Sequence, residues 1–153
     1  MTGVQTCALP ILASTNPGPA ITTTIHPQNV TSNQAVRLLA VFTGVNVNAT
    51  GDQAVLPIGN STNYSVSNVI FTNASTSLTT AAAGVFTAPS AGGTAIVANA
   101  ALSGLTGSTV VSQRTVATTN TQTGQNLYVN VGTAQGAAAT MDVYVYGYDF
   151  STF

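Results

Sequence analysis

The sequence predicts an all-β domain, an antiparallel β-sandwich of jelly-roll type with about eight strands. Short segments rich in β-branched and aromatic residues recur along the chain, and turn-forming residues separate them at intervals of roughly 8–12 residues. No segment shows the sustained period of a long amphipathic helix. A hydrophobic share of 44% also argues for a folded chain with a substantial core.

Composition divides the chain into three parts. Residues 1–11 read MTGVQTCALPI and resemble the translation of a short-read sequencing adapter over their whole length. We treat them as an artefact and leave them, with Cys7, out of the fold prediction. Residues 12–34 combine three prolines with scattered threonines, which predicts an extended arm or linker. Residues 35–153 then form the β-sandwich domain.

The first strands of this domain follow from alternating apolar residues. Residues 36–42 are apolar in both alternating sets, so we expect a strand that is buried on much of both faces. A second strand covers residues 53–58, where Pro57 suits an edge or a strand end. In residues 64–72 the parity of the apolar side chains changes near Asn68, which predicts a β-bulge.

The middle of the chain predicts strands with small side chains. Residues 78–88 include three alanines and a glycine at 81–84, but the β-branched and aromatic residues around them favour a strand over a helix. Small side chains let another backbone or sheet approach closely. Further strands are predicted at residues 94–98, 109–118 and 125–131.

The closing segment, residues 140–150, has two apolar sets. Met141, Val143 and Val145 alternate with a second set that carries the aromatic rings. The aliphatic set belongs in a core, and the aromatic set needs another burial partner. Three partners fit: the second sheet or the N-terminal arm of the same chain, another subunit, or a stacked sugar ring. The candidate interface residues are Tyr144, Tyr146, Tyr148 and Phe150.

Charge is nearly absent from the chain. Two arginines and three aspartates are the only charged side chains, 3% of the residues where roughly 25% is ordinary. We expect no nucleic-acid partner, because phosphate binding needs clustered Lys and Arg, and no membrane partner either. With no lysine to protect its edge strands, the domain is predicted to assemble with copies of itself.

The chain lacks a recognisable catalytic set, so we expect it not to be an enzyme. Asp142 and Asp149 lie on opposite faces of one predicted strand, and Asp52 lies on a turn. His26, the only imidazole, lies in the proline-rich arm, and no Gly-x-Ser-x-Gly motif occurs. One histidine and Cys7 do not make a zinc site. We therefore assign no catalytic, cofactor-binding or metal-binding residue.

Three segments carry a resemblance to known proteins: NASTSLTT at 73–80, GGTAIV at 92–97 and TAQGAAA at 133–139. With the strands around them, they make the chain from Leu38 onward resemble small structural proteins found among tailed-phage genes and environmental phage sequences. The resemblance implies a virion component, such as a head decoration, fibre-tip or tail-associated jelly roll, often trimeric. It transfers no site residue.

Together these observations predict a non-catalytic virion structural protein that self-assembles, with a homotrimer favoured, and that contacts other virion proteins. The alternative is a secreted or cell-surface module for carbohydrate binding or adhesion, with a surface glycan as its partner. Neither function requires a cofactor.

Overall fold

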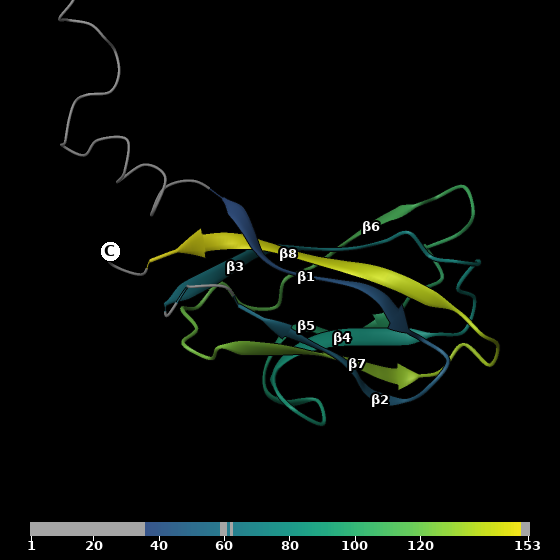
Figure 1. Ribbon diagram of the computed structural model, residues 1–153, viewed down its shortest axis with the longest axis horizontal. Helices are drawn as coiled ribbons and strands as arrows, with labels where there is room; N and C mark the ends of the chain where they lie inside the picture. The colour runs from purple at the N-terminus through teal and green to yellow at the C-terminus, as the bar shows by residue number, and fades with distance from the viewer. Residues whose placement is uncertain (1–35, 59–60, 62, 151–153) are drawn as a thin grey trace, which may run out of the picture.

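The computed structural model describes residues 36–58, 61 and 63–150. These residues form eight strands and no helix, which confirms the predicted all-β class. The predicted artefact at 1–11 and the arm at 12–34 lie outside the described residues. The strands are β1 (Arg37–Asn46), β2 (Gly51–Pro57), β3 (Tyr64–Thr72), β4 (Ala82–Ala88), β5 (Gly92–Ala101), β6 (Val111–Arg114), β7 (Asn126–Thr133) and β8 (Thr140–Asp149) (Figure 1).

The strands build two four-stranded sheets that stack as a sandwich (Figure 1). Their orders are β1-β8-β3-β6 and β2-β7-β4-β5, and every pair is antiparallel. The pairing is nested, because β1 pairs with β8, β2 with β7, β3 with β6 and β4 with β5. Apart from β4 and β5, consecutive strands therefore lie in opposite sheets.

The core lies between the sheets and takes buried side chains from every strand except β6. Met141, Val143 and Val145 of β8 are fully buried in it, as the sequence predicted. On β7, the same holds for Leu127, Val129 and Val131. Sheets that pack face to face in this way interdigitate their inner side chains over about 10 Å.

Two β-bulges flank the end of β8. On β3 the register with β8 shifts between Val66 and Asn68, where the sequence predicted a bulge. On β1 it shifts between Leu38 and Ala40. A bulge adds one residue to its strand and reverses the alternation beyond it. In both β1 and β3, the side chains that point into the core therefore change parity opposite residues 145–147 of β8.

Gly147 lies in β8 between these two bulges, where there is no room for a side chain. A Cβ at this position would lie 2.7 Å from Leu39 Cδ1 and still closer to the backbone oxygen of Ser65. Because Gly147 has no side chain, Leu39 of β1 and the backbone of Ser65 in β3 can pack closely against β8 at this point.

The outer face of β1 is exposed to solvent. The expected burial of residues 36–42 on both faces of the strand is therefore wrong. Leu38 and Val41 are 47% and 42% exposed, whereas Leu39 and Ala40 are buried. The bulge turns Leu39 and Ala40 inward in succession. Because β1 is at the edge of its sheet, its outer side chains have neighbours on one side only.

Other strands differ from the prediction mainly in length. Pro57 ends β2, an edge strand, as expected. The predicted strand at 109–118 shortens to β6, and the one at 94–98 lengthens to β5. The small residues of β4 do permit a close approach, since a Cβ at Gly84 would lie 2.6 Å from the backbone oxygen of Val97 in β5.

We predict that Gly147→Ala lowers the free energy of unfolding by about 1–3 kcal/mol, the usual cost of overpacking a filled site. Denaturant titration followed by circular dichroism would measure this loss. Gly104→Ala is the matched control, because no described atom lies within 4 Å of the position that its Cβ would take. Equal stability of the two variants would contradict the close packing at Gly147.

Candidate functional site

The predicted interface residues lie on the outer face of β8. Because Met141, Val143 and Val145 point into the core, the tyrosines that alternate with them point away from the second sheet. The proposed burial of these tyrosines against the second sheet is therefore wrong. Tyr144, Tyr146 and Tyr148 are partly exposed, and Phe150 beyond the strand end is 40% exposed.

Neighbouring strands extend this apolar surface on both sides of β8. Tyr146 is paired with Leu38 of β1, and Tyr144 lies between Val41 of β1 and Ile70 of β3. Cross-strand neighbours of this kind lie within side-chain contact distance. We call the combined surface the tyrosine face; it comprises Leu38, Val41, Ile70, Tyr144, Tyr146 and Tyr148.

Aromatic and polar contacts border the tyrosine face. The rings of Tyr148 and Phe150 stack with centroids 6.4 Å apart and an interplanar angle of 15°. Asn68, paired with Tyr146, accepts a 2.6 Å hydrogen bond at its Oδ1 from Nε2 of Gln113. The face is thus apolar at its centre and carries amide groups toward β6.

Asp142 begins the outward-facing set but is buried and supports turns. Its Oδ1 accepts a 2.8 Å hydrogen bond from the backbone N–H of Gly44, and its Oδ2 accepts a 2.9 Å bond from Nδ2 of Asn73. Both donor residues have positive φ, 73° and 51°. Asp142 therefore fixes the irregularity of β1 at Gly44 and the turn that follows β3 at Asn73.

The other two carboxylates also have structural partners. Asp149, buried on the opposite face of β8 from Asp142, forms an ion pair with Arg37 of β1. Asp52 accepts 2.7 Å hydrogen bonds from the backbone N–H of Ser90 and from Nδ2 of Asn130. The described residues contain no group of three His, Cys, Asp or Glu side chains that could hold a metal ion.

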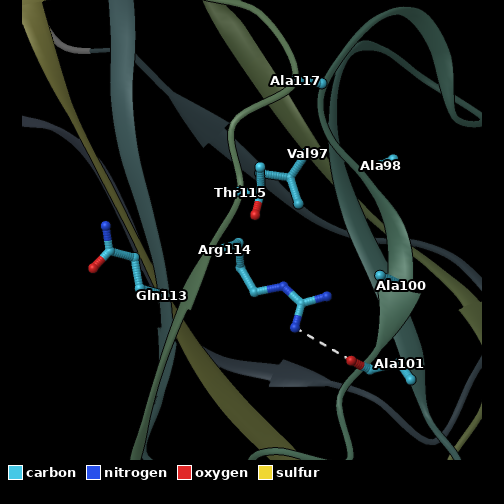
Figure 2. Close-up of a pocket in the computed structure, with 8 residues that line it drawn as sticks. All are labelled: Val97, Ala98, Ala100, Ala101, Gln113, Arg114, Thr115 and Ala117. Atoms are coloured by element: carbon cyan, nitrogen blue, oxygen red, sulfur yellow. Dashed lines mark hydrogen bonds between the residues drawn. The ribbon is translucent and has the colours of Figure 1, made fainter.

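A second feature, which the sequence did not predict, lies between the edge strands β5 and β6. It is a groove of about 570 Å³. Figure 2 shows Arg114 extending from β6 toward β5 across this groove. Its lining residues are Val97, Ala98, Ala100, Ala101, Gln113, Arg114, Thr115 and Ala117.

Arg114 is held by contacts on two sides. Its Nη1 donates a 3.2 Å hydrogen bond to the carbonyl oxygen of Ala101, drawn in Figure 2, and a 3.5 Å bond to Oγ of Ser112. Its guanidinium carbon lies 5.4 Å from the centroid of the Phe71 ring, a cation–π distance. Burial lowers the pKa of Arg114, but a guanidinium stays charged at neutral pH.

Tyr64 differs from the tyrosines of the outer face because it is fully buried. Its hydroxyl donates a 2.8 Å hydrogen bond to the carbonyl oxygen of Gly124. Burial raises the pKa of Tyr64 from 10.0 to about 12, because the phenolate would lose its hydration.

Comparisons with known proteins give no assignment. No protein-family model matches the chain, and no curated protein or solved structure matches it. Within the part of the chain that the structure describes, no helix could cross a membrane. Any function must therefore be argued from the surfaces described above.

Tyr64 should make the folded state sensitive to alkaline pH. Its folded pKa exceeds the unfolded value, so its contribution is complete below pH 10 and is lost as the pH rises from 10 to about 12. The loss amounts to about 2–3 kcal/mol. Tyr64→Phe should lower the free energy of unfolding by about 1 kcal/mol at neutral pH, because the hydrogen bond is lost. The stability of this variant should then decline less than that of the wild type as the pH rises from 10 to about 12.

Denaturant titrations of both proteins from neutral pH to about pH 12 would measure the effect. The remaining tyrosines are common to the two proteins and cancel in the comparison. Parallel decline of the two stabilities would show that Tyr64 does not carry the alkaline sensitivity.

Proposed function

We propose that the chain is a non-catalytic virion structural protein that self-assembles through the tyrosine face. The observation that carries this proposal is the apolar outer face of β8, continuous with exposed Leu38 and Val41 on β1. Single exposed apolar side chains are common on soluble proteins, but a contiguous apolar surface usually marks an interaction site. Here the apolar residues come from three adjacent strands.

The size of the aromatic rings makes association favourable. A Tyr ring buries about 150–250 Å². Tyr144, Tyr146 and Tyr148 are already mostly covered within the chain. At about 25 cal/mol per Å², covering the remaining exposed third or less of each ring favours association by only a few kcal/mol in total. Association itself costs about 4–15 kcal/mol in lost motion, so the aliphatic neighbours Leu38, Val41 and Ile70 must contribute as well.

Charge does not oppose contact between two copies of this face. Arg37 and Asp149 neutralise each other, and the carboxylate of Asp142 is buried under two hydrogen bonds. Copies of the chain can therefore approach through this face without strong like-charge repulsion.

The finer parts of the proposal come from the sequence. The virion location, the preference for a trimer and the contact with other virion proteins follow from the resemblance to tailed-phage structural proteins. The jelly-roll form is supported by eight strands in two sheets and by the nested pairing of β1 with β8 and β2 with β7.

The same surface also supports the second candidate, a module that binds a surface glycan. Partly exposed rings beside the Asn68 and Gln113 amides are the groups that stack on a sugar and hydrogen-bond its hydroxyls. These two amides bond each other, and Tyr148 stacks on Phe150, which leaves fewer groups free for a sugar. Self-association therefore ranks first.

Light scattering after size-exclusion chromatography tests self-association. We expect the full chain to elute above its monomer mass of 15.3 kDa. Tyr146→Ala should weaken the assembly about thirtyfold, from the ~2 kcal/mol of an aromatic anchor, while the monomer stays folded. Tyr128→Ala is the matched control, since Tyr128 is a partly exposed tyrosine on β7 of the other sheet.

A wild-type chain that is monomeric at every concentration would contradict self-assembly. Retention of such a monomer on a glycan array, lost in Tyr146→Ala, would favour the carbohydrate-binding alternative. Equal weakening by Tyr146→Ala and Tyr128→Ala would place the contact elsewhere.

A further inference from the structure

We propose that the groove between β5 and β6 binds a carboxylate that carries a short aliphatic chain, and that Arg114 is the residue that binds the anion. The groove is separate from the tyrosine face, so this inference does not depend on self-assembly.

The guanidinium keeps donors available for a ligand. Its two hydrogen bonds within the described chain both come from Nη1. In Figure 2 the other terminal nitrogen is directed into the groove beside Ala100. An arginine presents five N–H donors in a planar fork that matches the two oxygens of a carboxylate. Arg114 can therefore hold the Ala101 carbonyl and still bind an anion.

The charge of Arg114 is not neutralised by an acidic side chain of the described chain. The three acidic residues are Asp52, Asp142 and Asp149. Asp149 pairs with Arg37, and the other two carboxylates accept hydrogen bonds from amide groups elsewhere in the fold. The groove thus carries one positive charge, which a single carboxylate would balance.

The walls of the groove select for an aliphatic group next to that carboxylate. Four of the eight lining residues are alanines, and Val97 adds a further apolar side chain. The volume of about 570 Å³ falls in the range of about 300–1,000 Å³ that is usual for small-molecule sites. Phosphate groups usually bind where several positive or backbone N–H donors converge, and here one guanidinium provides the charge.

Arg114 is also held in place before a ligand arrives. The Phe71 ring lies against its guanidinium, and the Ala101 carbonyl fixes one end of the fork. A side chain that is already ordered loses little freedom on binding. The bond to Ala101 joins the edges of the two sheets, as does the 2.8 Å bond from the N–H of Ala117 to the carbonyl oxygen of Ile96.

Butyrate titrated into the full chain, followed by NMR, tests the proposal. We expect saturable shifts at the Arg114 Nε–Hε resonance and at the methyl groups of Ala98, Ala100 and Ala101. Butyramide, which has the same shape without the charge, should bind at least about tenfold more weakly, the low end for charge-assisted hydrogen bonds. Inorganic phosphate should also bind more weakly than butyrate.

The same chemistry occurs in a free short-chain acid and in the side chain of a glutamate. N-acetylglutamate amide is therefore titrated alongside butyrate. Tighter binding of the glutamate derivative would identify a glutamate of a partner protein as the ligand group, and tighter binding of butyrate would identify a free acid.

Two variants locate the site. Arg114→Gln removes the charge, and Ala100→Leu fills the groove while keeping Arg114; each should weaken butyrate binding at least about tenfold. Val55→Leu, on the exposed side of β2, is the control and should bind as the wild type does. If Arg114→Gln fails to fold, Ala100→Leu decides the matter. Absent or non-saturable shifts, equal binding of butyramide, or unchanged affinity in a folded groove variant would overturn the proposal.

Discussion

Met141, Val143 and Val145 pack in the core between the two sheets, and this packing decides which face of β8 is buried. The strand that carries them, β8, lies inside its sheet and is paired on both edges, with β1 and with β3. Because the side chains of a strand alternate, burial of this set commits the aromatic set to the outside. The tyrosine face is thus a direct consequence of how the core is filled.

The chain has few charged side chains, and most of them stabilise the fold. All three aspartate carboxylates have partners within the fold: Asp142 and Asp52 accept backbone hydrogen bonds, and Asp149 forms an ion pair. One arginine is used in the same way, through its ion pair with Asp149. The other arginine, Arg114, faces the groove between β5 and β6. The two candidate binding surfaces are therefore the uncharged tyrosine face and a groove that carries one cation.

Much of the fold could be predicted from local patterns. Local patterns predicted the strands β7 and β8 and the buried set of β8, and the change of parity near Asn68 predicted a bulge. The exposure of β1 could not be predicted, since it depends on the strand order, which places β1 at an edge. The groove was missed for a related reason: Ala98 and Arg114 belong to edge strands of different sheets and meet only in the folded chain.

Hydroxyl-radical footprinting of the full chain over a dilution series tests most directly whether the tyrosine face is covered by another copy. We expect oxidation of Tyr146 and Tyr148 to increase on dilution, as the assembly dissociates and exposes them. Oxidation of Tyr128, on the other sheet, should stay constant, and the fully buried Tyr64 should remain protected throughout. An oxidation rate of Tyr146 that does not change with concentration and equals that of Tyr128 would show that no other copy covers the tyrosine face.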